Sequence, residues 1–183
     1  MTLFATEMPK KVRLHLRDAV GRLTTEWELN RVRSPRPLPI WTPDVAGLDG
    51  ENGLQYHSAG WRCLLAQDSK LGWIDLQKPQ LGLGIPQLGG QQQTEQLLAK
   101  LVDLERSEWA ACDKQYEVRI ISIRYLHLSA IWLFGQGEVE SNLVFPMLSN
   151  ESGPVALADW DTIVGKAAAK KKIDPAKRYR VGA

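Results

Sequence analysis

The chain has 183 residues, of which 44% are hydrophobic and 24% charged, with a formal net charge of +2. A chain of this length can bury its own core, and no apolar run reaches the roughly 18–20 residues that span a membrane, so we expect a soluble protein with no membrane association. Two cysteines are too few for a disulfide framework, and the first residues lack the pattern of a secretion signal, which favours a cytoplasmic location.

Charge is unevenly distributed along the chain. Residues 1–43 carry 8 basic and 4 acidic side chains, residues 44–165 carry 8 and 16, and residues 166–183 carry 7 and 1. Basic ends on an acidic body either fold back onto that body or bind an acidic partner. We expect one α+β domain over residues 1–183, with a basic C-terminal tail at 173–183.

Residues 10–32 show two runs of alternating polarity on either side of a turn-like segment at 18–21. An amphipathic helix is the first interpretation, but a β-hairpin matches both faces in one register. The register pairs Val12 with Trp27, Leu14 with Thr25, Leu16 with Leu23, Arg13 with Glu26 and Lys11 with Glu28. The sequence therefore predicts a hairpin in which glutamates neutralise the basic residues.

The segment 34–43 contains four prolines and is predicted to be extended and excluded from the centre of a sheet. It also contains Trp41. Because aromatic side chains dominate binding hot spots, Trp41 is a candidate anchor of a protein interface.

Residues 60–77 predict a second hairpin that turns at 68–71. Its inward-facing residues would be Trp61, Cys63, Leu65, Ile74 and Leu76. Residues 79–93, rich in Gly, Pro and Gln, are predicted to form a loop.

The rest of the chain predicts helices at 95–112, with Thr94 as its N-cap, and at 157–172. Strands are expected at 116–125, in a central position, and near 142–147. The apolar run 126–134 fits either a buried helix or a strand. The predicted fold class is α+β: an antiparallel sheet built from two hairpins and these strands, packed against two helices.

Three motifs invite a catalytic interpretation. The glycine-rich stretch 82–90 lacks the glycine and lysine spacing of a nucleotide loop. Cys63 lies near His57, but its inward position favours a core residue over a nucleophile. Cys112 follows Glu108 by one helical turn, and a neighbouring carboxylate disfavours its thiolate.

Glu105 and Glu108 share a helix face with apolar residues. Such a pair can do acid–base chemistry or bind a metal, but structural ion pairs with Arg106, Arg119 or Arg124 are the favoured interpretation. His127, in an apolar run, is expected to be a hydrogen-bonded core residue. We expect no metal and no cofactor, because no clustered ligand set accompanies these residues.

The strongest positive signal is the basic C-terminal tract. Its members are Lys166, Lys170, Lys171, Lys172, Lys177, Arg178 and Arg180. Lysines and arginines near an aromatic residue, here Tyr179, can bind phosphate backbones, although a solvated helix end fits as well.

The sequence favours a non-catalytic intracellular protein, an interaction or assembly component with a protein partner or a second copy of itself. The first alternative is nucleic-acid association through the basic tract. The second is a small hydrolase-type enzyme that uses Glu105 and Glu108, or Cys63. No catalytic residue is assigned.

Overall fold

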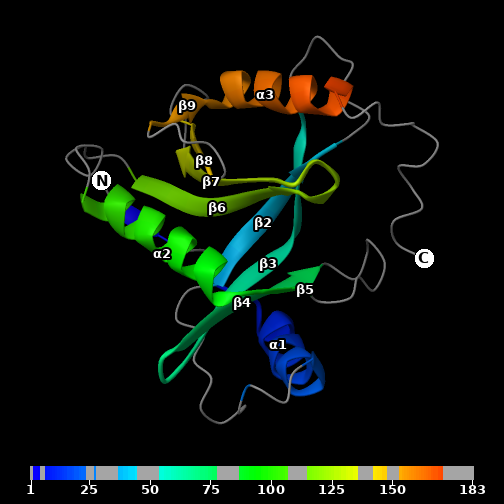
Figure 1. Ribbon diagram of the computed structural model, residues 1–183, viewed down its shortest axis with the longest axis vertical. Helices are drawn as coiled ribbons and strands as arrows, with labels where there is room; N and C mark the ends of the chain where they lie inside the picture. The colour runs from blue at the N-terminus through cyan, green and yellow to red at the C-terminus, as the bar shows by residue number, and fades with distance from the viewer. Residues whose placement is uncertain are drawn as a thin grey trace.

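The computed structural model describes residues 2–4, 7–23, 27, 37–44, 54–77, 87–106, 115–135, 142–147 and 153–170. Figure 1 shows the helices and strands of this part of the chain. In chain order they are β1 (Thr2–Phe4), α1 (Lys10–Leu23), β2 (Pro37–Pro43), β3 (Tyr56–Gln67), β4 (Lys70–Gln77), β5 (Gln87–Gly89), α2 (Gln91–Arg106), β6 (Gln115–Ile123), the 3-10 turn η4 (Arg124–Leu126), β7 (Leu128–Gly135), β8 (Leu143–Pro146), β9 (Val155–Ala156) and α3 (Leu157–Lys170).

The strands of the described residues form one nine-stranded sheet. Its order is β5-β4-β3-β2-β6-β7-β8-β9, and β1 pairs with the start of β6. Only the β1–β6 and β2–β6 pairs are parallel, and all the other neighbours are antiparallel. The predicted α+β class with an antiparallel sheet and packed helices is therefore confirmed.

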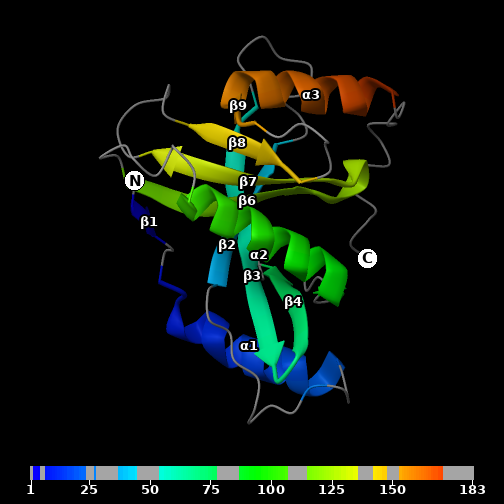
Figure 2. The same cartoon turned by 60° about the vertical axis from the view of Figure 1, so that its left-hand side comes forward.

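The helices cover both faces of this twisted sheet. Alternate residues of a strand point to opposite faces, and on β6 Ile120 belongs to the core under α2 whereas Ile121 belongs to the core under α3. On β3, Leu64 likewise faces α2 and Cys63 faces α1. Hence α1 and α3 lie on the face opposite α2, over different parts of the sheet, and they occupy opposite ends of the molecule in Figures 1 and 2.

The second predicted hairpin is confirmed. β3 and β4 pair from Gly60 opposite Gln77 to Gln67 opposite Lys70, so Asp68 and Ser69 alone form the turn. All five residues expected on its inner face belong to one core cluster under α1.

The predicted hairpin over 10–32 is wrong for residues 10–23, which form α1. The residues that pack on β3 and β4 are Val12, Leu16, Ala19 and Val20. Their spacing is helical, whereas Leu14, which a hairpin would bury, is 60% exposed. Of residues 24–32, the structure describes only Trp27, which packs against the same cluster.

The prediction that the proline-rich segment cannot join a central strand is also wrong. β2 lies between β3 and β6. Pro37 and Pro39 are two residues apart, so their missing N–H groups fall on the same side of the strand. The ladder with β6 is confined to Ile40 and Trp41, which retain their N–H groups, and a bulge at this step adjusts the register with β3.

The remaining predicted helices and strands agree with the structure except in their bounds, whereas the short strands β1, β5 and β9 were not predicted and β5 and the start of α2 replace part of the predicted loop 79–93. α2 begins at Gln91, so Thr94 is not its N-cap: it is buried in the first turn and donates its hydroxyl to the Gly90 carbonyl at 2.9 Å. The ambiguous run 126–134 is largely strand β7. Residues 107–112, the end of the predicted helix, and the tail 173–183 lie outside the described residues.

Candidate functional site

A cluster of aromatic side chains around Arg119 lies on the face of the sheet that carries α3. It draws residues from four strands: Trp41 (β2), Tyr56 (β3), Trp132 and Phe134 (β7), with Arg119 on β6. Trp132 is central: its ring centroid lies 5.7 Å from that of Trp41, 5.5 Å from that of Tyr56 and 5.4 Å from that of Phe134. Trp41 and Phe134 both meet it edge to face, an arrangement that aromatic quadrupoles favour.

The guanidinium of Arg119 lies among these rings. Its central carbon is 3.5 Å from the centroid of Phe134, 4.2 Å from that of Trp41 and 4.9 Å from that of Trp132. Its Nε and Nη2 both donate to one carboxylate oxygen of Glu117, at 2.8 and 2.5 Å. Burial lowers the pKa of Arg119, and the Glu117 carboxylate opposes that decrease. The cation is therefore held by one carboxylate and three aromatic faces.

Hydrogen bonds fix this cluster to the rest of the fold. The indole N–H of Trp132 donates to the Asn142 side chain at 3.1 Å, and the Tyr56 hydroxyl donates to Asp161 on α3 at 2.6 Å. The backbone N–H of Leu54 donates to the other oxygen of Asp161 at 3.1 Å. Burial raises the pKa of Asp161, and these two hydrogen bonds oppose the increase. Burial also raises the pKa of Tyr56 well above its ordinary value, and the nearby Asp161 carboxylate adds to that increase.

Trp41 is the residue of this cluster that the sequence singled out. Its side chain is part-buried beside the α3 core, and its indole N–H is buried with no hydrogen-bond partner among the described residues. Its role as an interface anchor stays a prediction. Arg119 and its neighbours were missed, although a signal existed: Glu117 and Arg119 interrupt one face of an otherwise apolar strand.

A second buried ion pair lies on the α2 side of the sheet. Arg62 donates to both carboxylate oxygens of Asp75, at 2.8 and 2.9 Å, and its guanidinium also lies 3.9 Å from the centroid of Trp73. Arg124 approaches the same carboxylate at 3.9 Å. Burial lowers the pKa of Arg124, and Asp75 opposes that change. Because Arg62 and Asp75 satisfy each other, this pair links β3 to β4 and presents no open reactive group.

The structure places Cys63 and Glu105, the two described residues of the enzyme hypothesis, on opposite sides of the sheet. Cys63 is fully buried in the core under α1, with its sulfur 3.8 Å from that of Met8, as expected for a core residue. Glu105 is exposed near the end of α2, so it does not lie within the buried stripe of that helix, and Glu108 and Cys112 lie outside the described residues. Among the described residues no group of three or more potential ligands could hold a metal ion.

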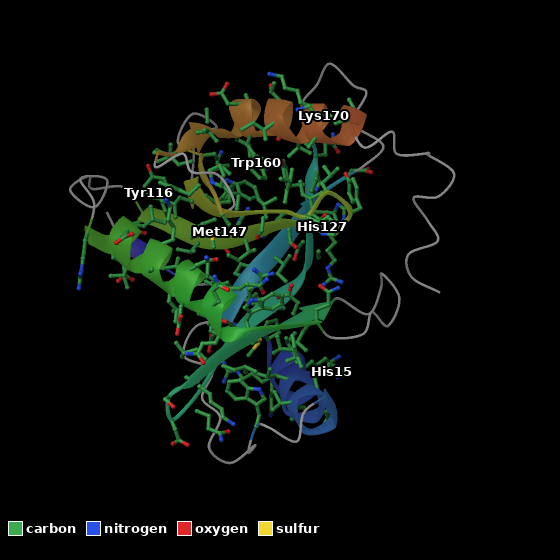
Figure 3. All side chains as sticks on the ribbon, viewed as in Figure 1. His15, Tyr116, His127, Met147, Trp160 and Lys170 are labelled. Atoms are coloured by element: carbon green, nitrogen blue, oxygen red, sulfur yellow. The ribbon has the colours of Figure 1, made fainter. Side chains whose placement is uncertain are left out.

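The expectation for His127 is wrong. Its side chain is exposed, and its backbone adopts the left-handed conformation (φ 55°) that ends the η4 turn, where its N–H donates to the Arg124 carbonyl. The chain reverses here between β6 and β7, so the apolar run around His127 does not enclose it; Figure 3 labels it at this turn.

The glycine-rich stretch is described only from residue 87. There β5 pairs with β4 and leads through Gly90 into α2. The sequence did not predict this strand or this helix start. Trp73 lies against Gly89, so the backbone at this position approaches a side chain of the protein itself.

Two members of the basic C-terminal tract are described: Lys166 and Lys170 are exposed on α3. The other five lie outside the described residues.

None of the described helices is long and apolar enough to cross a membrane. No protein-family model, no curated protein and no solved structure matches this chain.

Proposed function

We propose that this protein acts by binding another protein chain, as a non-catalytic interaction or assembly component, and that the surface around Trp41 is its contact. The observation that carries the proposal is the aromatic cluster around Arg119. Trp, Tyr and Arg are the residue types that contribute most to binding energy at protein interfaces, and here they converge in one cluster, in which Trp41 and Tyr56 are part-exposed whereas Arg119 and Trp132 are buried.

The cluster is also held in place before any partner binds. Glu117 fixes Arg119, Asn142 fixes Trp132 and Asp161 fixes Tyr56. A surface whose side chains are already ordered loses little conformational entropy on association, which supports a binding role.

The test places a photo-crosslinking amino acid, p-benzoylphenylalanine, at position 41 in the full chain, where one aromatic side chain replaces another. Trp73 is the matched control, because it is also a part-buried tryptophan but faces α2. A discrete crosslinked product from position 41 and none from position 73 is expected. Circular dichroism would establish that both variants fold.

Sedimentation velocity identifies the partner class. If the partner is a second copy, the wild-type chain sediments above 20.5 kDa, and Trp41→Ala returns it to the monomer. A strict monomer that gives no crosslink from position 41 in cell extract would overturn the proposal.

The nucleic-acid alternative rests on the exposure of Lys166 and Lys170 on α3. Because Ala167 and Ala168 pack against the core under α3, a truncation that tests the tail should end after Lys170 and leave that helix whole. The alternative predicts salt-sensitive binding that is much weaker in residues 1–170, which retain Lys166 and Lys170 but lack the other five basic residues of the tract. The enzyme alternative is less well supported, because Cys63 is buried in the core under α1 and Glu105 lies on α2, which covers the opposite face of the sheet.

A further inference from the structure

Helix α1 presents a basic face to solvent. Its 14 residues contain five Lys or Arg and one Asp. Lys10, Lys11, Arg13 and His15 are exposed, and Leu14 lies among them with 60% of its surface exposed. The opposite side of the helix packs on β3 and β4, so this face points away from the sheet, at the end of the molecule remote from α3; Figure 3 labels His15 on α1 and Lys170 on α3.

The helix does not give these cations the cross-strand register that would pair them with glutamates in a hairpin. In a hairpin, Arg13 and Lys11 would face glutamates across the ladder. In the helix, the described contact of Arg13 is an ion pair with Glu7 at 3.2 Å. The Arg13 side chain is 58% exposed and the Glu7 side chain 93% exposed. A pair this open to water is weak and readily exchanged for another anion.

The position of the lysines is unfavourable for the helix itself. Lys10 and Lys11 occupy the first turn, which has no acidic residue, and the helix dipole disfavours cations there. A local arrangement that works against stability is more readily explained by a contact with something outside the fold.

We propose that the outward face of α1 binds the phosphate backbone of a nucleic acid. A helix of this length presents roughly 21 Å of surface, enough to follow several consecutive phosphates, at 1.5 Å per residue. Lysine and arginine supply the phosphate contacts, and Leu14 can lie against the apolar edge of a sugar or base.

A membrane surface fits this helix less well. Interfacial helices insert their apolar face into lipid. The apolar face of α1, which includes Val12, Leu16 and Val20, is already buried against Cys63 and Ile74 of the sheet. Among the side chains of α1 whose burial is described, Leu14 is the one large apolar side chain left to insert. This proposal is independent of the Trp41 surface, since α1 and the aromatic cluster belong to different core clusters.

The test measures fluorescence anisotropy of a 24-nucleotide single-stranded RNA and of a 24-base-pair DNA duplex, titrated with the full chain from 50 to 200 mM KCl. Lys10→Gln combined with Lys11→Gln is expected to weaken binding about tenfold at 100 mM salt. The slope of log affinity against log salt is negative, and the double substitution should make it shallower by about 1.4 for the RNA or about 1.8 for the duplex, because two phosphate contacts are lost. Binding of one probe alone identifies which of the two is the source of the phosphates.

The matched control is Lys166→Gln combined with Lys170→Gln, which changes the net charge equally on α3. It is expected to leave most of the affinity intact. If it abolishes binding while the α1 variant does not, the tail alternative holds and the α1 proposal fails. Binding of phosphatidylserine vesicles but of neither nucleic acid would overturn the proposal as well.

A second variant tests the proposal by gain of affinity, which a folding defect cannot imitate. Asp18 is exposed and is the one acidic residue of α1. Asp18→Asn should tighten binding about two- to fivefold, because it removes repulsion between a carboxylate and the phosphates. Asp159→Asn makes the same charge change on α3 and should have a smaller effect. Equal effects of the two substitutions would contradict a site on α1.

Discussion

Arg62 and Asp75 lie directly opposite each other on β3 and β4, and the arginine donates to both carboxylate oxygens. Their side chains are 10% and 1% exposed, so each is the main compensation for the charge of the other. The ladder register thus brings two residues that are 13 positions apart in the sequence into one buried ion pair.

Asp75→Asn should therefore lower the free energy of unfolding by about 3–5 kcal/mol, because it leaves the Arg62 cation buried without a countercharge. Urea unfolding followed by circular dichroism measures the change. The matched control is Glu7→Gln, which breaks the exposed ion pair with Arg13 and should produce no measurable loss. Similar losses in the two variants would show that burial does not determine the strength of these pairs.

Gly89 should not tolerate a side chain. A Cβ at this position would lie 1.8 Å from a ring atom of Trp73, and the same ring lies against the Arg62 guanidinium. Gly89→Ala must displace that tryptophan, and we expect it to lower the free energy of unfolding by about 1–3 kcal/mol, as overpacking does. Gly90→Ala is the neighbouring control, because a Cβ there meets nothing within 4 Å. Because Gly90 directly precedes α2, where alanine is a poorer helix cap, Gly90→Ala should lower the free energy of unfolding by less than about 1 kcal/mol. Equal midpoints in thermal unfolding would contradict the predicted contact.

Arg119 and Glu117 should be energetically coupled. Arg119→Met removes the cation from among the three rings, and Glu117→Gln removes the carboxylate that holds it. Because each substitution eliminates the same ion pair, the double variant should lose less stability than the sum of the single losses, by about 0.5–3 kcal/mol. Urea unfolding of the four proteins gives this coupling energy directly. Additivity to within about 0.3 kcal/mol would mean that the pair contributes nothing beyond packing.

The hairpin of β3 and β4 could be predicted from the sequence, because alternation of polarity and a short turn both lie within 22 residues of chain. The hairpin proposed for 10–32 failed although its register was consistent on both faces. Spacings of four residues, such as Val12 to Leu16, fit a strand and a helix equally. The helix differs from the predicted hairpin in burying Ala19 and Val20 and in exposing Leu14. The exposure of Leu14 depends on packing against β3 and β4, which the local sequence does not encode.

The aromatic cluster lies beyond such local patterns. Trp41 and Trp132 are 91 positions apart, and they meet only because β2 and β7 both flank β6. The prolines of β2 argued against that central position, because proline has no N–H group to donate to a neighbouring strand. The ladder between β2 and β6 pairs only Ile40 and Trp41, neither of which is a proline, so the prolines do not prevent it. The residue types of the cluster could be read from the sequence, but their convergence required the strand order.

The stability of the protein should depend on pH through Asp161. Burial raises the pKa of this carboxyl in the folded protein above its value in the unfolded chain. The folded state therefore binds the proton more tightly. Its contribution to stability is complete below the ordinary aspartate pKa of about 3.9 and is lost as the pH rises through the higher folded-state value.

Asp161→Asn removes this titration. The free energy of unfolding of the wild-type chain, measured relative to that of the variant, should fall as the pH rises from the ordinary aspartate pKa of about 3.9 through the higher folded-state value. Asp159→Asn, an exposed residue of the same helix, corrects for the general effect of removing a negative charge from α3. A difference between wild type and Asp161→Asn that stays constant over this range, or that grows as the pH rises, would show that the Tyr56 and Leu54 hydrogen bonds outweigh burial at this carboxylate.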